Sequence, residues 1–297
     1  MSNVPKLRFK EFSGEWEVQR LEQLSSKISD GIHSTPEYNE DGDYYFVNGN
    51  NLKNGVIILD ENTKRVTKEE ALKYYRELTN QTILMSINGT IGNLAFYNNE
   101  DIMLGKSACY ININDSLTNK HFISNQLSSS KIQYYYTSEL TGSTIKNLSL
   151  KTIKNTPIQL PSEQEQEKIA SFLTSVDTKI QQLTKKEELL SSYKKGVMQK
   201  IFSGDIRFKA DDGSEFTPWE EKKLGDVGTT FNGLTGKTSE NFGTGKPYIQ
   251  YKQIFGSSKI SLDGFGYVSI APNERQNKAQ FGDIFFTTSS ETPNEVA

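Results

Sequence analysis

Few residues of this chain are of the types that catalyse reactions or bind metals. The 297 residues include two histidines, His33 and His121, and one cysteine, Cys109. Neither histidine lies in an H-E-x-x-H or H-x-E pattern, and a lone cysteine forms neither an intrachain disulfide nor a cysteine-based metal site. We interpret Cys109 as a small buried apolar residue. These residue types therefore predict no catalytic or metal centre in the chain.

Cofactor-binding motifs are missing as well. The sequence contains no GxxxxGK[ST] loop for ATP, no GxGxxG turn for S-adenosylmethionine or a dinucleotide, and no Asp-Pro-Pro-Tyr tetrapeptide of an amino-methyltransferase. Asp212, Glu220 and Glu221 loosely resemble the carboxylates of a nuclease, but an internal repeat places Val18 where Glu221 stands in the second copy. We predict that the chain is not an enzyme and binds no cofactor itself.

The residues best suited to bind a ligand are short polar side chains in turns after predicted strands. Residues 86–92 (SINGTIG) end a strand in a turn with two glycines, which is typical both of a hairpin and of a loop that closely approaches a ligand. Similar polar turns occupy residues 30–36 (DGIHSTP) and 48–51 (NGNN). Asparagine can form two hydrogen bonds with the edge of an adenine, so these turns are candidates for reading DNA bases.

Length, composition and charge limit the class of protein. A chain of 297 residues suits about two domains, and its 34% of apolar residues can bury a core. No apolar run approaches the ~18–20 residues of a membrane span and no signal peptide is visible, so we expect a cytoplasmic protein without a membrane partner. A protein that binds DNA without partners usually has an excess of basic residues, whereas this chain has a net charge of −3. Residues 119–160 carry five lysines against one acid, so any DNA contact should be local or shared with a more basic partner.

The sequence contains an internal repeat with a period near 200 residues. Its two tryptophans, Trp16 and Trp219, lie 203 positions apart, and each is followed by Glu, three variable residues and Leu. From the tryptophans onward the offset changes only from 203 to 201, which indicates a duplicated domain and not a solenoid of 20–50-residue repeats. The other matches pair residues 8–10 with 207–209, 46–52 with 248–254, and 82–86 with 283–287.

Between the copies, residues 162–203 have the pattern of a long helix without proline. An S-x-x-E capping box at residues 162–165 marks its start, and Gly204 is the predicted C′ residue at its end. Apolar residues recur with heptad spacing, which favours a rod of roughly 60 Å packed along another helix. One helix cannot bury its own seam, so a partner helix must come from this chain or another. The seam consists of Ile169, Leu173, Val176, Ile180, Leu183, Leu190, Val197 and Ile201.

The flanking copies have the pattern of mixed α/β domains. Short β-rich segments alternate with Asn, Gly and Asp turns, and two segments are predicted to be helical. The predicted strands are residues 44–47, 56–59, 83–87, 94–97 and 108–113, and the predicted helices are residues 68–77 and 121–137.

In their order along the chain, these segments resemble the specificity subunits of type I restriction–modification systems. The resemblance includes the opening segment at residues 5–21, the turn at residues 88–92 (NGTIG) and residues 142–149 (GSTIKNLS). Its most specific part is residues 160–173 (LPSEQEQEKIASFL), which are similar to the start of that family's central spacer helix. Residues 190–204 (LSSYKKGVMQKIFSG) are similar to the end of the same helix.

The resemblance implies an α+β fold and a division of labour. Residues 1–160 would form a mixed α/β target-recognition domain, residues 161–204 a coiled-coil spacer helix, and residues 205–297 a partial second target-recognition domain. Each such domain reads one half of a bipartite site in double-stranded DNA. The implied partners are methyltransferase subunits and restriction/translocase subunits, which would bind S-adenosylmethionine, ATP and Mg²⁺.

Under this interpretation the polar groups of the strand-end turns contact DNA, and Lys106 and Lys146 hold phosphates. The full set is His33, Ser34, Asn48, Asn50, Asn51, Asn88, Thr90, Lys106, Thr144, Lys146 and Asn147. Two alternatives remain. One is a coiled-coil adaptor whose two lobes bind a sugar or a peptide, and the other is a stand-alone methyltransferase or nuclease.

The second copy matches only part of the first. The first copy extends over 156 residues from Pro5 to Leu160, whereas 93 residues run from Asp205 to Ala297. Counterparts of residues 94–160 and of the spacer helix are not found. We therefore expect either a fragment of a longer chain or a short subunit whose helix pairs with that of a second copy. Such a self-dimer would read a palindromic split site.

Overall fold

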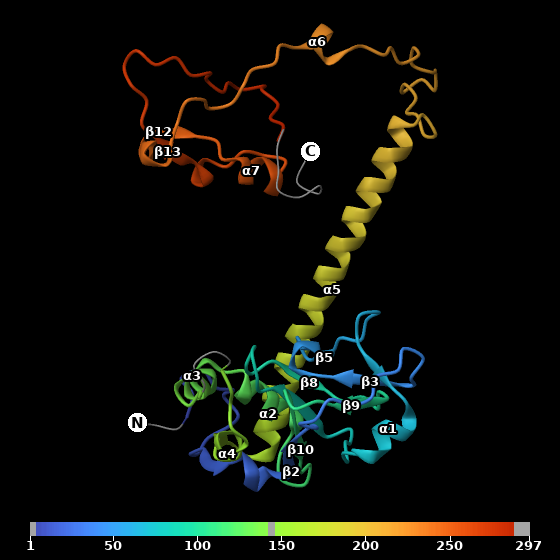
Figure 1. The fold of residues 1–297 in the computed structure, drawn as a ribbon, viewed down its shortest axis with the longest axis vertical. Coiled ribbons are helices and arrows are strands. Elements are labelled where there is room, and N and C mark those ends of the chain that lie inside the picture. Colours follow the sequence, from blue (N-terminus) through green and yellow to red (C-terminus); the bar gives the residue numbers. More distant parts are fainter. Residues whose placement is uncertain (1–3, 142–145, 288–297) are drawn as a thin grey trace. The chain divides into compact units, whose positions relative to one another are not determined.

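The computed structural model of the chain describes residues 4–141 and 146–287, which belong to two compact units (Figure 1). The first unit is Met1–Ile206 and the second is Arg207–Ala297. The first unit combines helices with sheets, in agreement with the predicted α+β class, and it contains the predicted long helix. Within the described residues, no helix is both long and apolar enough to cross a membrane.

Two sheets form the frame of the first unit. Its strands are β1 Glu17–Arg20, β2 Ser25–Asp30, β3 Tyr44–Val47, β4 Leu52–Lys53, β5 Val56–Ile57, β6 Arg65–Val66, β7 Thr82–Ser86, β8 Leu94–Phe96, β9 Ile102–Leu104, β10 Ala108–Ile113 and β11 Pro157–Leu160. The larger sheet has the order β2-β10-β7-β8 with all neighbours antiparallel. The smaller has the order β6-β3-β9, and β3 is parallel to β9. β1 pairs with β11, and β4 with β5.

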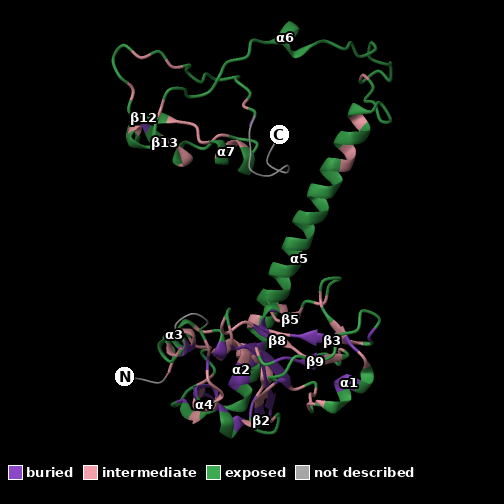
Figure 2. Cartoon of the chain, viewed as in Figure 1, coloured by how far each residue is buried: buried purple, intermediate pink, exposed green. Residues whose placement is uncertain are grey.

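Helices cover the larger sheet and connect the strands. They are η1 Leu21–Leu24, η2 Gly49–Asn51, α1 Lys68–Lys73, α2 Lys120–Leu127, α3 Ser130–Ser138, α4 Leu150–Lys154 and α5 Glu163–Phe202. Phe122 of α2, Ile132 of α3 and Ile153 of α4 are buried in one cluster with Ile83 of β7 and Ile111 of β10. Figure 2 shows the buried residues concentrated among these strands and helices, whereas α5 is exposed beyond its first turns. The core therefore lies between the larger sheet and the three short helices.

The predicted elements agree with the structure in position more than in length. The strands predicted at residues 44–47 and 108–113 have the bounds of β3 and β10. The helix predicted at residues 68–77 ends at Lys73. The segment predicted as one helix at residues 121–137 is two, because the Ser129 side chain accepts a hydrogen bond from the Ile132 amide over 3.4 Å and starts α3 anew.

The long helix begins and ends where the sequence places its caps. Ser162 accepts a hydrogen bond from the Glu165 amide over 3.4 Å, and Gly204 follows the helix with a φ of 83°. The Glu165 carboxylate, which a capping box would turn back toward Ser162, is instead bound by Arg8 over 2.6 and 2.7 Å. Arg8 thus joins the opening segment of the chain to the first turn of α5.

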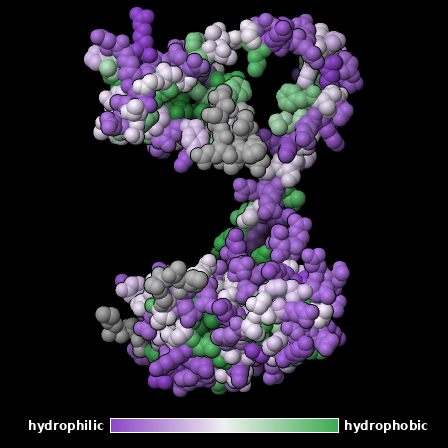
Figure 3. Space-filling view, viewed as in Figure 1, coloured by the Kyte–Doolittle hydropathy of each residue, from purple (hydrophilic) through white to green (hydrophobic). Residues whose placement is uncertain are grey.

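The apolar seam of α5 is largely uncovered. Ile169 packs against the core of the first unit, whereas Val176, Ile180, Leu183 and Leu190 are 41–56% exposed. Figure 3 shows hydrophobic surface among the polar side chains of this helix. In the described part of the chain no other helix is longer than the nine residues of α3, so none matches the seam in length. The seam remains available to a partner helix, as the heptad pattern predicts.

The second unit repeats local geometry of the first. Its elements are α6 Leu224–Val227, η3 Ser239–Asn241, β12 Phe242–Tyr248, α7 Tyr251–Gly256, η4 Leu262–Gly264 and β13 Gly266–Val268. β12 and β13 are antiparallel with Lys246 opposite Val268, and β3 and β6 are antiparallel with Tyr44 opposite Val66. Both partners are shifted by 202 positions, so the two strand pairs have the same register. The structure thus supports the duplication read from the sequence.

The two copies differ in burial. Trp16 is 7% exposed and packs against Phe122, whereas Trp219 is 59% exposed. Among the described residues of the second unit, Val268 is the one buried apolar residue. Residues 283–287 match β7 in sequence but form no strand. In the first unit β7 is hydrogen-bonded between β8 and β10, and no described strand of the second unit offers that pairing.

Candidate nucleic-acid interface

The carboxyl ends of several strands of the first unit meet at one edge. β2 and β7 run in the same direction because both are antiparallel to β10, and β3 runs parallel to β9. The turns that follow β2 and β7 therefore lie at one end of the larger sheet, and those that follow β3 and β9 lie at one end of the smaller sheet. We name these turns, together with residues 146–148, the strand-end loops. They comprise residues 31–35, 48–51, 87–93, 105–107 and 146–148.

Backbone hydrogen bonds join the strand-end loops across the two sheets. The Ile32 amide donates to the Leu104 carbonyl over 2.8 Å, and the Gly105 amide donates to the Val47 carbonyl over 2.8 Å. A Cβ atom at Gly31 would lie 2.0 Å from the Leu104 oxygen, so only glycine permits this approach. The loops after β2, β3 and β9 are thereby held as one surface.

Residues 146–148 join this surface from a distant part of the sequence. The Ile87 amide donates to the Ser107 carbonyl over 3.0 Å, and the Leu148 amide donates to the Ile87 carbonyl over 2.9 Å. The Gly89 amide donates to the Lys146 carbonyl over 3.2 Å. Residues 87–93 connect the antiparallel strands β7 and β8, so the glycine turn is a hairpin turn that also belongs to the strand-end loops.

The loop after β3 is fixed by side-chain hydrogen bonds. The Ser107 hydroxyl donates to the Oδ1 atom of Asn48 over 2.7 Å and accepts from the Gly49 amide over 2.9 Å. Asn51 accepts from the Asn48 amide over 3.0 Å and donates to the Ile58 carbonyl over 3.1 Å. Asn51 therefore closes the loop, whereas Ser107 orients the amide of Asn48.

The remaining predicted contact residues are distributed over the same loops. His33 pairs with Asp30, its Nε2 atom lying 2.9 Å from the Oδ2 atom of the carboxylate. Thr144 lies outside the described residues. The exposed members of the set are His33, Ser34, Asn50, Thr90, Lys106 and Lys146, and the half-buried members are Asn48, Asn51, Asn88 and Asn147. Ten of the eleven predicted residues thus lie on the strand-end loops.

The sequence prediction missed three residues that hold the strand-end loops in place but are not themselves candidate DNA contacts. Ser107 orients Asn48, and Gly31 and Gly105 allow the backbones to meet. The sequence did contain a signal for these residues, the tripeptide Gly-Lys-Ser at residues 105–107. Glycine and serine on either side of Lys106, a candidate phosphate ligand, are typical of a tight turn. Only the contact between distant loops reveals what Ser107 does.

The chemistry of this surface is that of binding. Two exposed lysines, Lys106 and Lys146, can neutralise phosphates, and the amides and hydroxyls of the loops can exchange hydrogen bonds with base edges. The Cys109 thiol is buried, and burial raises its pKa far above the usual range, which confirms its interpretation as an apolar residue. Within residues 4–141 and 146–287, no group of three or more His, Cys, Asp or Glu residues could hold a metal ion.

The fold combines an α/β domain, whose strand-end loops form one surface, with a long exposed helix. The family model for the type I restriction modification DNA specificity domain matches residues 13–191, more than half of the chain. The chain therefore belongs to the family of type I restriction–modification DNA specificity domains.

Individual relatives agree with this assignment. The chain is 26% identical over 274 residues to a putative type I restriction enzyme MjaX specificity subunit of Methanocaldococcus jannaschii, covering 86% of this chain and 63% of the relative. It is 26% identical over 285 residues to the MjaVIII specificity subunit of the same organism, covering 91% of this chain and 63% of the relative. The chain thus spans about 63% of the length of these curated relatives.

A solved structure has a similar fold. The S subunit of a type I restriction–modification system from M. genitalium matches with a TM-score of 0.51 and 21% identity, covering 92% of this chain and 66% of that chain.

Proposed function

We propose that the first unit reads one half of a bipartite site in double-stranded DNA, and that the chain directs a type I restriction–modification complex to that site. One observation carries the proposal. In a chain of the DNA specificity family, loops from five separate parts of the sequence are joined into one surface with asparagines, hydroxyls and two lysines. Such a surface can bind phosphates for position and base edges for specificity.

The proposal assigns catalysis to other subunits. Methyltransferase subunits and restriction/translocase subunits would bind the chain in the cytoplasm and supply the sites for S-adenosylmethionine, ATP and Mg²⁺. The net charge of −3 supports a complex in which partner subunits supply part of the phosphate contacts, because phosphate neutralisation dominates the affinity of proteins that bind DNA alone. The exposed seam of α5 is the proposed dock for these partners or for a second copy of the helix.

The test separates phosphate contacts from base contacts. The target is first identified by mapping methylated adenines in the host DNA, and binding of the chain with its methyltransferase partner is then measured over a range of salt concentrations. Lys106→Ala and Lys146→Ala should each weaken binding to all sequences and reduce the slope of log K against log salt by about one. Asn88→Ala should instead lower discrimination at one base pair by about 1–3 kcal/mol.

Lys27→Ala is the matched control. Lys27 is an exposed lysine near the start of β2, at the edge opposite the strand-end loops, so its loss should leave the salt slope unchanged. If Lys106→Ala and Lys146→Ala retain the wild-type slope, or if Lys27→Ala changes it equally, the strand-end loops do not face DNA.

A further inference from the structure

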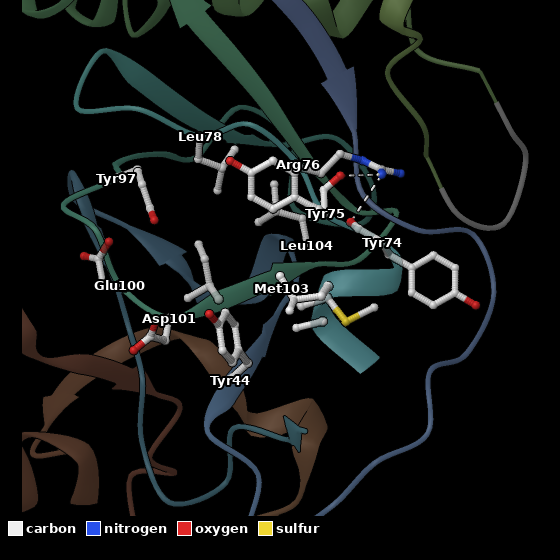
Figure 4. A pocket seen from close by; sticks show the side chains of 13 residues that line it. Tyr44, Tyr74, Tyr75, Arg76, Leu78, Tyr97, Glu100, Asp101, Met103 and Leu104 are labelled. Carbon is white, nitrogen blue, oxygen red and sulfur yellow. Dashed lines mark hydrogen bonds between the residues drawn. The ribbon is translucent and has the colours of Figure 1, made fainter. Parts of the chain in front are cut away.

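A cavity of about 130 Å³ lies in the first unit, apart from the strand-end loops. It is lined by Ile102 and Leu104 of β9 and by the tyrosines Tyr44, Tyr75 and Tyr97 (Figure 4). Tyr44 and Ile102 are the first residues of the parallel strands β3 and β9. The lining extends along all three residues of β9, from Ile102 to Leu104, and none of the lining residues belongs to the strand-end loops.

The lining of the cavity has an excess of negative charge, with two carboxylates and one guanidinium. Figure 4 shows Glu100 and Asp101 on the same side of the cavity as Tyr97. In the described part of the chain neither carboxylate takes part in a salt bridge. Burial, followed by the charges of Glu100 and Asp101, raises the pKa of the Tyr97 hydroxyl. These groups together favour a cation over an anion.

One cation, Arg76, also lines the cavity, but its hydrogen bonds are used within the protein. Its guanidinium donates to the backbone carbonyls of Asp30, Tyr74 and Tyr75 over 3.1, 3.2 and 3.2 Å. Figure 4 shows it turned away from the carboxylates of Glu100 and Asp101. The lining therefore contains two carboxylates and one guanidinium, and that guanidinium is already hydrogen-bonded to backbone carbonyls.

We propose that this cavity binds the guanidinium group of an arginine side chain that a partner protein presents. A guanidinium is planar and weakly hydrated, so it stacks on aromatic faces and pairs with carboxylates at partly buried sites better than an ammonium does. The aliphatic stem of the arginine would pack against Leu78, Ile102 and Leu104, which also line the cavity.

The chemistry of the cavity selects a protein partner over DNA. Carboxylates repel phosphates, and none of the lining residues belongs to the strand-end loops. The inference goes beyond the proposed function, because it stands on the cavity alone and can be tested without DNA.

The test uses the full chain labelled with fluorotyrosine and a blocked arginine, N-acetyl-arginine methylamide, as the probe. Fluorine NMR should show saturable shifts of the resonances assigned to Tyr44, Tyr75 and Tyr97. In the Glu100→Gln/Asp101→Asn double variant the dissociation constant should rise about tenfold or more, since both charge-assisted pairs are lost. The amides keep the shape of the side chains. The Glu100→Gln change also keeps an oxygen that can accept from the Asn98 amide, as the Glu100 carboxylate does over 2.7 Å.

The control is Glu40→Gln/Glu61→Gln, which removes two exposed carboxylates elsewhere in the same unit and should leave probe binding unchanged. Shifts that do not saturate, or that the Glu100→Gln/Asp101→Asn variant retains, would overturn the proposal. Equal binding of N-acetyl-lysine methylamide would overturn the assignment to a guanidinium. Loss of DNA binding in the same double variant would assign the cavity to DNA, and DNA binding is therefore measured separately.

Discussion

The Ser107 hydroxyl orients the side-chain amide of Asn48, which we propose contacts a base. It donates to the Oδ1 atom of Asn48 over 2.7 Å, so the Nδ2 atom of that amide is left as the hydrogen-bond donor. It also satisfies the Gly49 amide at the start of η2. Under the proposed function, Ser107 would influence specificity by selecting the rotamer of Asn48.

We expect Ser107→Ala to weaken DNA binding and to destabilise the first unit by about 1–2 kcal/mol, because the variant leaves the Gly49 amide without its acceptor. Thermal unfolding and DNA titration of the same sample measure the two effects. Ser116→Ala is the control. It removes a similar hydrogen bond, from Ser116 to Asn114 over 2.6 Å, in the turn after the last residue of β10 at the other edge of the sheet. DNA binding that is lost equally in both variants would show that stability, and not orientation, is responsible.

At this scale the sequence identified the types of residue but not their roles. Asn48, Asn50 and Asn51 look alike in the string NGNN, and only the structure separates Asn51, which closes its own loop, from Asn50, which is exposed. That distinction depends on Ile58, which folds back onto the loop through the pairing of β4 and β5. The Asn54-Gly55 pair, in which both residues have a positive φ, is a local signal for that hairpin, but it does not show that Asn51 donates to Ile58.

At the scale of elements, α5 is the part of the fold that sequence predicts best. Its apolar spacing, its Ser162 cap and Gly204 are all local signals, and the helix extends from Glu163 to Phe202 between them. The pairing of Arg8 with Glu165 could not be predicted, because 157 positions separate the two residues. The break between α2 and α3 could have been predicted, because Ser129 is a strong N-cap residue inside an otherwise helical pattern.

Leu183→Asp tests what α5 does. Leu183 is 53% exposed and belongs to no core of the first unit, so the substitution should leave the thermal unfolding of that unit unchanged. In a closed seam the same carboxylate would be buried without a partner, at a cost of several kcal/mol. We expect assembly with the methyltransferase subunit to fail in size-exclusion chromatography with light scattering.

Gln182→Asp introduces the same charge one position away from the seam, and we expect it to assemble as the wild type does. A Leu183→Asp variant that assembles normally would show that the seam is not a dock. One that unfolds the first unit would show that α5 belongs to its core.

At the scale of the whole molecule, the two copies of the repeat share local geometry but differ in burial. The register of β3 with β6 recurs in β12 with β13 at an offset of 202, so the copies share local geometry. What differs is burial, since Trp16 is covered by Phe122 and Trp219 is exposed. Sequence matching could detect the shared local geometry, because strand register follows from the pattern of apolar residues. Burial depends on which other segments pack against the repeat, and the matched segments do not contain that information.

The last prediction concerns the independence of the first unit. Its strand-end loops and its core come from residues 4–170, so exchanging residues 1–155 for the domain of another specificity subunit should transfer the surface as a whole. In the reconstituted complex, sequencing of methylated adenines should then show one changed half-site, while the other half and the spacing between them stay the same. The spacing should persist because α5 is retained.

The position of the junction supplies the control for this exchange. A junction at residue 155 leaves β11 in this chain, where it must pair with β1 of the donor and place Ile158 in the donor's core. A junction at residue 161 carries β1 and β11 together and keeps that pair intact. If the second junction yields an active complex whose two half-sites have both changed, recognition is shared across the chain, and the two copies do not read DNA independently.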